Sequence, residues 1–385
     1  MNLKAAGKTH VGLVRENNED FFHIDEGKGL FIVSDGIGGE VAGEVASSSA
    51  VSQIVSYLDN HDEFIDNCRS GNVKDEDIFR FFAKAVRHSS NEIYKMSNQS
   101  MKYVNMGATL TMAVDMGSRI LICHVGDSRA YLLNESGVHQ LTEDHTLFTD
   151  LQKKGLIKGE QDVQSYMHRT LTRSLGTANS IEVDCLMIPM VDDDKLILCT
   201  DGVSNYLTDE DEITDLVDDN NLEGNVDALI DFAISSRGED NATAIVIKVA
   251  KNSENGEESL QENLIMEILM SCTIYEGLNY QELSAIRSFM EVVSLNKEEV
   301  LVQACEKYSG FFIVMDGGIL SKDELLIRGD SIGLKALVKE HYCPEDKVAV
   351  RNSHLLYLSR RKFDALCVKF PRIANKILLN VIKLM

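Results

Sequence analysis

Short apolar runs recur along the first 250 residues, and several of them are bounded by an acidic residue. Three such runs predict strands, and the third of them is rich in β-branched residues: residues 30–34 (LFIVS), 195–200 (KLILCT) and 242–250 (ATAIVIKVA). An aspartate stands at one end of each run, and these residues are Asp35, Asp201 and Asp240. The pattern therefore places three carboxylates at strand ends.

A fourth acidic residue lies in a predicted turn. Residues 120–125 (ILICHV) and 129–133 (RAYLL) have the composition of strands, and Gly126 between them permits backbone conformations that other residues avoid. We predict a β-hairpin with Asp127 in its turn. The polar segment 15–22 (RENNEDFF) contributes two more carboxylates, those of Glu19 and Asp20.

Together these acidic positions suit a divalent cation site. A single Asp-Gly pair after a strand is more often a turn than a ligand, so no single position decides the matter. As a set they supply the oxygen ligands that Mg²⁺ and Mn²⁺ prefer. Because these ions retain several waters, a few carboxylates and one backbone carbonyl suffice for two ions. Gly36, directly after Asp35, would let its carbonyl approach an ion.

The length and the charge distribution indicate two domains. The chain has 385 residues, whereas a typical domain has about 100–200. Its formal net charge is −23, yet residues 260–385 carry 16 basic and 16 acidic residues, so the excess of negative charge lies before them. An acidic surface repels phosphate backbones, and nucleic-acid binding is therefore not expected.

The domain boundary is predicted at residues 251–259 (KNSENGEES), a polar, glycine-containing linker. Residues 1–250 then form one domain and residues 260–385 another, which opens with an amphipathic helix at 260–272. The first 18 residues contain no apolar run of signal-peptide type, and no later stretch approaches the ~18 apolar residues of a membrane span. We expect a cytoplasmic protein without membrane contact.

Eight motifs in residues 1–250 carry a resemblance to a known family. They are GLVRENNED at 12–20, VSDGIGG at 33–39, GATLT at 107–111, HVGDSRAYL at 124–132, LTEDHT at 141–146, LTRSLGT at 171–177, LCTDGVSNYL at 198–207 and DNATAIVI at 240–247. In these motifs and their order the segment resembles the protein phosphatase 2C family of metal-dependent phosphatases. The resemblance implies an α+β fold, in which two packed antiparallel sheets form a β-sandwich flanked by helices, with a metal site at one end.

The resemblance also implies a set of ligands for two core ions, Mn²⁺ or Mg²⁺. Asp35 would bridge the two ions. Asp201 and Asp240 would complete the coordination of one ion, and Glu19 with the Gly36 carbonyl would serve the other.

Other residues would act around this core. Asp127, together with Asp201, resembles the ligand pair for a third, weaker ion in bacterial members of the family. Arg15 matches the arginine that binds the substrate phosphate, and its planar guanidinium suits two phosphate oxygens. Asp20 and Asn241 adjoin the ligands in sequence and are expected to support them.

The implied activity is hydrolysis of phosphoserine and phosphothreonine in proteins. Two cations about 3.5–4 Å apart lower the pKa of a bridging water, so that hydroxide attacks phosphorus in line with the departing oxygen. Many eukaryotic members have a histidine as general acid where this chain has Ile37. The proton for the leaving group would then come from metal-bound water or from His145, although a histidine beside Asp144 is more often structural. The segment 146–169 matches the family's mobile flap, which suggests a role in substrate selection.

The second domain resembles a cyclic-nucleotide-binding domain. The similarity lies in FFIVMDGGIL at 311–320, GDSIG at 329–333 and HLLYLSRRKFDAL at 354–366. Between residues 292 and 358, β-branched runs alternate with glycine turns, which predicts a β-roll, or jelly roll. A helix at 279–290 and another spanning 363–378 would flank it.

The residues that would bind a cyclic nucleotide depart from that family's pattern. Leu334 follows Gly333 where a glutamate is expected for the ribose, and residues 343–345 (CPE) fall where an arginine is expected for the phosphate. Lys335, Lys339 or Lys347 would have to bind the phosphate instead. A role in protein contact or self-association is favoured over nucleotide binding.

Two functions of different classes remain open from the sequence. The favoured one is an active serine/threonine phosphatase regulated through its C-terminal domain. The alternative is a pseudophosphatase, a phosphoprotein-binding scaffold without turnover. Loss of ligands would mark the alternative, and every expected core carboxylate is present.

Overall fold

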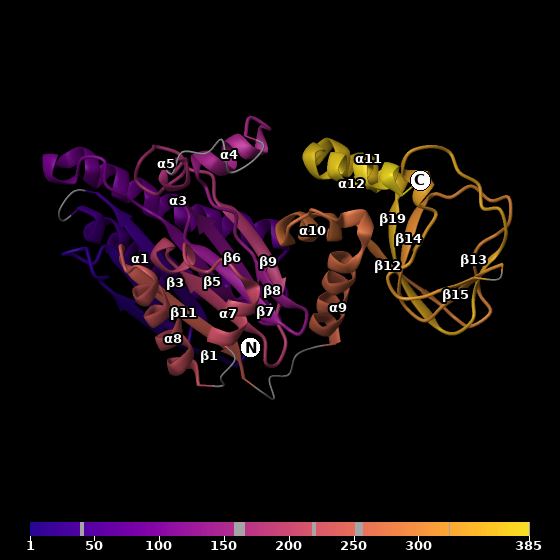
Figure 1. Cartoon of the computed structure of the whole chain (residues 1–385), viewed down its shortest axis with the longest axis horizontal. Coiled ribbons are helices and arrows are strands. Elements are labelled where there is room, and N and C mark those ends of the chain that lie inside the picture. The colour runs from indigo at the N-terminus through magenta and orange to yellow at the C-terminus, as the bar shows by residue number, and fades with distance from the viewer. Residues whose placement is uncertain (39–41, 158–165, 218–220, 251–256, 323, 385) are drawn as a thin grey trace. The chain divides into compact units, whose positions relative to one another are not determined.

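The computed structural model of the chain describes residues 1–38, 42–157, 166–217, 221–250, 257–322 and 324–384. The chain divides into two compact units, Met1–Ser259 and Leu260–Met385 (Figure 1). Residues 251–256, which make up most of the expected linker, lie outside the described residues. Each unit is considered by itself below.

The first unit contains two antiparallel sheets. One sheet has five strands in the order β1 (Leu3–His10), β11 (Ala242–Val249), β10 (Lys195–Cys199), β7 (Arg129–Asn134) and β8 (Gly137–Gln140). The other has the order β2 (Asp20–Asp25), β3 (Leu30–Ile37), β5 (Leu110–Asp115), β6 (Arg119–Val125) and β9 (Asp184–Pro189), with β4 (Gly107–Ala108) paired to β3. All pairings between these strands are antiparallel.

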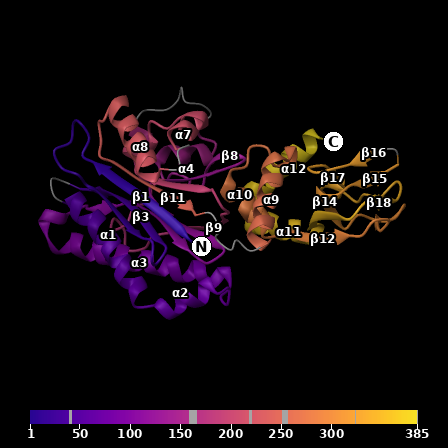
Figure 2. The ribbon, with the colours of Figure 1, turned by 90° about the horizontal axis from the view of Figure 1, so that it is seen from below.

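Helices cover the outer faces of both sheets (Figure 2). The helices of this unit are α1 (Ala42–Asp59), α2 (Asp62–Arg69), α3 (Asp75–Gln99), α4 (Leu147–Lys153), α5 (Tyr166–Arg169), α6 (Asp201–Ser204), α7 (Glu210–Leu216) and α8 (Leu222–Ser236). On one face of β3, Leu30 and Ile32 pack in the core beneath α1 and α3. The alternate residues Phe31 and Val33 point to the other face and are also buried. The strand is therefore apolar at successive positions because both of its faces are covered.

Two expectations about local structure are wrong. The strand β3 does not end before Asp35 but continues to Ile37, because Gly36 pairs with Ala108 of β4. Strands β6 and β7 do not form a hairpin, since β6 pairs with β5 and β9 whereas β7 pairs with β10 and β8. The turn that contains Asp127 therefore crosses from one sheet to the other.

The second unit contains two four-stranded antiparallel sheets. One has the order β12 (Glu291–Leu295), β19 (Ser353–Ser359), β14 (Gly310–Asp316) and β17 (Ser331–Ile332). The other has the order β13 (Val300–Val302), β18 (Lys347–Ala349), β15 (Ile319–Ser321) and β16 (Glu324–Leu326). The helices α9 (Glu257–Ser271) and α10 (Tyr280–Arg287) precede the sheets in the chain.

The single C-terminal helix expected at 363–378 is wrong, because two helices occupy this region. The helix α11 (Arg360–Lys369) ends before Phe370, and α12 (Pro371–Lys383) begins with proline at its first position. Proline has no backbone N–H and disfavours a helical conformation in the residue before it, so the helix breaks there. Among the described residues, we found no helix with the length and apolarity that crossing a bilayer requires.

Candidate metal centre

Four of the predicted carboxylates line one cavity in the first unit. The cavity has a volume of about 740 Å³, and Asp35, Asp127, Asp201 and Asp240 contribute to its wall together with Arg15. Asp35 comes from β3 of one sheet, Asp201 and Asp240 adjoin strands of the other sheet, and Asp127 lies on the crossover between the sheets. The site thus gathers residues from both layers of the sandwich.

A network of buried hydroxyl groups fixes the backbone of Asp35. The backbone N–H of Asp35 donates to Oγ1 of Thr109 at 2.8 Å, and the Asp35 carbonyl accepts from the Thr109 N–H at 2.8 Å. Oγ1 of Thr109 also lies 2.7 Å from Oγ of Ser128, the residue after Asp127. The strand that carries Asp35 and the turn that carries Asp127 are therefore joined through one threonine.

Asp201 begins the short helix α6, directly after the end of β10. Its neighbour Gly202 lies so close to the loop before β11 that a Cβ atom there would stand 1.8 Å from the carbonyl oxygen of Asn241. Such an approach of two backbones is possible only for glycine. Gly202 thus allows the segments of Asp201 and Asp240 to come together.

The loop around Asp240 is held by its neighbour Asn241. Oδ1 of Asn241 accepts the backbone N–H of Glu19 at 2.8 Å, and Nδ2 donates to the carbonyls of Val11 and Asn17 at 2.8 and 2.9 Å. This one side chain therefore ties the Asp240 loop to the N-terminal segment. Glu19 in turn accepts the Gly36 N–H with its backbone carbonyl at 3.1 Å, which sets it beside β3.

Asp20 links the two sheets behind the cavity. Its Oδ2 accepts hydrogen bonds from the hydroxyl groups of Thr200, at 2.8 Å, and Thr243, at 2.6 Å. Its Oδ1 is buried and has no hydrogen-bond partner among the described residues. A buried carboxylate oxygen without a partner is costly, and a cation or its bound water would satisfy it.

Burial, together with the charges of neighbouring carboxylates, raises the pKa values of the acidic residues in the site. Burial, followed by the charges of Asp20 and Asp201, raises the pKa of Asp35 well above its usual range. Burial and the charges of Asp201 and Asp144 raise the pKa of Asp127 to about 8. Burial and the charge of Asp240 raise the pKa of Asp201 to about 6. Bound cations would therefore strongly stabilise the ionised form of these carboxylates.

Comparison with known proteins agrees with the motifs. The sequence profile of a family described as protein phosphatase 2C matches residues 6–223. The chain belongs to the protein phosphatase 2C family. Residues of this phosphatase 2C domain also align with a protein named serine/threonine phosphatase stp from Listeria monocytogenes, with 32% identity over 249 residues that cover 64% of this chain and 96% of that protein.

Solved structures of the family share the fold of this domain. The serine/threonine phosphatase PstP/Ppp of Mycobacterium tuberculosis is 29% identical, with a TM-score of 0.56, and the match covers 64% of this chain and 99% of that one. A structure of the catalytic domain of PstP in complex with two manganese ions gives 29% identity, a TM-score of 0.55 and coverage of 65% and 99%. The phosphatase 2C domain thus has the architecture of these antiparallel-sheet phosphatases.

The donor set of the phosphatase 2C domain fits divalent ions of the magnesium type. Every candidate ligand side chain presents carboxylate oxygen, the donor that these ions prefer. As the side chains stand, the described part of the chain contains no group of three or more His, Cys, Asp or Glu placed to hold one ion. Both oxygens of Asp240 are engaged, Oδ2 by Arg15 at 2.7 Å and Oδ1 by the Asn241 N–H at 2.9 Å.

Two other residues considered from the sequence lie in different surroundings. Ile37 lines the cavity and is 37% exposed, so an apolar side chain occupies the wall at this point. His145 does not line the cavity but is buried behind it, where both ring nitrogens contact other polar groups. It is therefore not placed to reach a substrate in this cavity.

Sequence reasoning missed several polar residues of the site. Arg169, Ser174, Thr177 and Asn205 line the cavity, and Asn205 donates to Oδ2 of Asp201 at 3.3 Å. They belong to the quoted LTRSLGT and LCTDGVSNYL motifs or adjoin them. The signal that could have revealed them is the occurrence of polar residues inside motifs whose other members are acidic ligands.

Proposed function

We propose that the phosphatase 2C domain is a metal-dependent serine/threonine phosphoprotein phosphatase. The observation that carries this proposal is the convergence of four partly buried carboxylates on one cavity, in a domain with relatives named serine/threonine phosphatases. Such a concentration of negative charge repels a phosphate monoester unless cations balance it. The site therefore requires ions before it can receive its substrate.

The core ligands would be those that the resemblance implies. Asp35 would bridge two ions, with Asp201 and Asp240 on one and Glu19 with the Gly36 carbonyl on the other. The described side chains would leave room for water in the remaining positions, as Mg²⁺ and Mn²⁺ require. Two bound ions would supply a hydroxide nucleophile at neutral pH and neutralise the charge of the phosphate.

The chain's own residues would orient the substrate around these ions. Arg15 lines the cavity, and its five N–H donors allow it to hold Asp240 with one group and phosphate oxygens with others. Asp127 would hold a third ion with Asp201. Among the described residues that line the cavity there is no histidine, so the proton for the leaving oxygen would come from water.

The direct test is hydrolysis of a phosphothreonine peptide by the purified chain. We expect release of phosphate with Mn²⁺ or Mg²⁺ present and loss of the activity in excess chelator, with recovery when Mn²⁺ is restored. Turnover that survives exhaustive chelation would contradict the proposal. Binding of the peptide without turnover in Mn²⁺ would instead support the pseudophosphatase, which no residue of the site now favours.

For the second unit we propose a role in protein contact, self-association or regulation rather than nucleotide binding. Nζ of Lys347 is buried and lies 3.0 Å from Oε1 of Glu345, so its charge is already balanced. Nη1 of Arg360 donates to the carbonyls of Ala336 and Leu337 at 3.2 and 2.7 Å. These two cations are thus committed within the unit, which leaves them poorly placed to bind a cyclic phosphate.

A further inference from the structure

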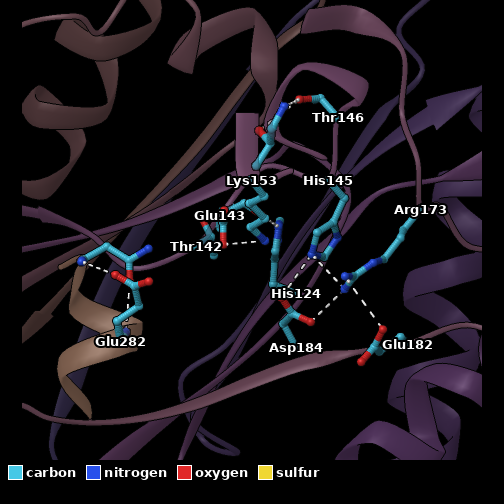
Figure 3. A network of polar contacts seen from close by, with 12 residues as sticks. His124, Thr142, Glu143, His145, Thr146, Lys153, Arg173, Glu182, Asp184 and Glu282 are labelled. Carbon is cyan, nitrogen blue, oxygen red and sulfur yellow. Dashed lines mark hydrogen bonds and ion pairs between the residues drawn. The ribbon is translucent and has the colours of Figure 1, made fainter. Parts of the chain in front are cut away.

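A buried polar network lies behind the candidate metal centre and is separate from the ligands. Figure 3 shows His145 and Arg173 converging on Asp184, the first residue of β9. Nε2 of His145 lies 3.1 Å from Oδ2 of Asp184, and Nη1 of Arg173 lies 2.9 Å from its Oδ1. His145 is only 3% exposed. Neither the proposed ligands nor the phosphate contact explains why these three residues are brought together.

The contacts of His145 determine its tautomer. The backbone N–H of Gly126 donates to Nδ1 of His145 at 3.0 Å, and this donor cannot act as an acceptor. Nδ1 must therefore carry the lone pair, and the ring hydrogen must be on Nε2, where Oδ2 of Asp184 accepts it. Arg173 lies 3.2 Å from Nε2 but can only donate, so its hydrogen bond goes to Asp184 instead.

His145 holds Gly126 by two hydrogen bonds in opposite directions. Besides the bond to its ring, Gly126 accepts the backbone N–H of His145 with its carbonyl at 2.7 Å. Gly126 has a φ of +113°, and a Cβ atom there would stand 2.7 Å from side-chain atoms of Thr109. The turn before Asp127 is thus in a conformation available to glycine, and His145 fixes it from behind.

The backbone of His145, in the LTEDHT motif, also contacts the LTRSLGT motif. The His145 carbonyl accepts the Thr172 N–H at 2.8 Å, and the Thr170 carbonyl accepts the Leu147 N–H at 2.8 Å. Thr146 and Leu171 form an antiparallel bridge between these contacts. His145 therefore contacts both the turn that presents Asp127 and Thr172, which lies beyond the C-terminal end of the segment 147–170.

We propose that His145, oriented by Asp184, is a positioning residue that sets the Gly126 turn and thereby the place of Asp127 in the centre. The inference rests on the proposed function, since Asp127 is assigned to the third, weaker ion there. It predicts that the acceptor nitrogen Nδ1, rather than the bulk of the ring, is what the centre needs from His145. Residues that orient a ligand from behind typically change metal affinity by about 10–100-fold when mutated.

Two substitutions distinguish the role of Nδ1 of His145 from that of the size of its ring. In His145→Asn, Oδ1 can take the place of Nδ1 and accept the Gly126 N–H, but the side chain is too short to reach Asp184. In His145→Gln, the longer side chain can reach Asp184 but leaves the Gly126 N–H without its acceptor. Both remove the ring, so a purely structural role predicts similar effects. His23→Gln is the matched control, because Nε2 of His23 is buried without a partner among the described residues.

Calorimetric titration of the full chain with Mn²⁺ measures the outcome without relying on turnover. We expect His145→Gln to weaken the low-affinity class of Mn²⁺ sites by about 10–100-fold, and His145→Asn to weaken it by less than about threefold. The affinity of the high-affinity Mn²⁺ sites, those of the two core ions, should be unchanged in both variants, since Asp127 is not among their ligands. Amide exchange of Gly126 should be accelerated in His145→Gln only.

A double-mutant cycle tests the part assigned to Asp184. Asp184→Ala should weaken the low-affinity class in the wild-type chain and should have no further effect in the His145→Asn background, where the link to Asp184 is already lost. Equal effects of His145→Asn and His145→Gln on Mn²⁺ binding, or an unchanged low-affinity class in both, would overturn the inference. Absence of all Mn²⁺ binding by the wild-type chain would instead overturn the proposed function.

Discussion

Nη2 of Arg15 donates to Oδ2 of Asp240 at a distance of 2.7 Å, although the two residues are 225 positions apart in the sequence. Both side chains are partly exposed and line the same cavity. The contact places the candidate phosphate-binding cation directly against a candidate metal ligand. Substrate phosphate and ions would therefore be bound side by side, with Arg15 adjoining both.

Arg15→Ala is expected to raise KM for a phosphothreonine peptide by about 10–100-fold while kcat changes less. A hydrogen bond to a charged group contributes about 1.5–3 kcal/mol, which corresponds to that factor. Mn²⁺ binding measured by calorimetry should persist, since Arg15 is not a ligand. Arg80→Ala, on the exposed face of α3, is the control and should leave both quantities unchanged. A loss of Mn²⁺ binding in Arg15→Ala would contradict the role given to this residue.

The carboxylate cluster predicts an unusual pH dependence of stability in chelator. The pKa values of Asp20, Asp127 and Asp201 are raised to about 7, 8 and 6, mainly by burial. An acid whose pKa is raised in the folded state binds its proton more tightly there than in the unfolded chain. The metal-free protein therefore loses stability as pH rises from about 4 to about 8.

Thermal unfolding measures this effect. In excess chelator the Tm should fall by several degrees between pH 5 and pH 8, whereas with Mn²⁺ it should fall less or rise, because the ions replace the protons. The stabilisation by Mn²⁺ should thus be larger at pH 8 than at pH 5. A gain in Tm from Mn²⁺ that is independent of pH would show that the ions do not bind at these carboxylates.

Gly202→Ala is expected to destabilise the phosphatase 2C domain by about 3 kcal/mol or more, because the new Cβ would collide with a backbone carbonyl. That atom would stand 1.8 Å from the Asn241 oxygen, and relief requires the Asp201 and Asp240 segments to separate. Urea unfolding and Mn²⁺ titration should both show the loss. Gly224→Ala, within α8, meets only the side chain of Asn221 and should be neutral or slightly stabilising. Equal stabilities of the two variants would exclude the tight approach.

Removal of residues 260–385 should leave a folded, metal-dependent enzyme. The Listeria relative matches 64% of this chain with 96% of its own length, so a protein of this kind exists without such an extension. The truncated chain should retain kcat for a small phosphopeptide but differ from the full chain in oligomeric state or regulation. Insoluble truncated protein, or one identical to the full chain in activity and oligomeric state, would count against the proposed role of the second unit.

The full chain is also expected to bind cyclic AMP and cyclic GMP weakly or not at all. If the resemblance of the second unit holds, Leu334 stands where a glutamate is expected for the ribose, and the charge of Lys347 is balanced by Glu345. A cyclic phosphate buried without a matched cation loses several kcal/mol of solvation. Calorimetry that detected micromolar binding would refute this expectation.

The sequence predicted individual strands near the site better than it predicted how those strands pair. Asp201 and Asp240 lie beside strand ends as the sequence predicts, because an apolar run bounded by aspartate is a local pattern, whereas β3 continues through Asp35 to Ile37. The partners of β6 and β7 could not be predicted, since neighbouring strands joined by a short turn usually pair with each other and here belong to different sheets.

Asp20 and Asn241 are expected from the sequence to support the ligands, but the contacts that such residues make behind the ligands could not be predicted. His145 and Asp184 are 39 residues apart, and Asp20 reaches hydroxyl groups 180 and 223 residues away. No periodic pattern marks contacts at such separations. The sequence leaves open whether His145 donates a proton or is structural, and its surroundings in the fold place it at the turn before Asp127.

Turnover of Asp35→Asn in saturating Mn²⁺ tests the central claim most directly. Asp35 lines the cavity from β3 and is the only residue assigned to both core ions, so loss of its charge should remove the bridge without removing bulk. We predict that kcat for a phosphothreonine peptide falls by at least about 10³-fold, while the substituted chain unfolds no more easily than the wild type in chelator. Near-normal turnover by Asp35→Asn would contradict the assignment of this cavity as the catalytic metal centre.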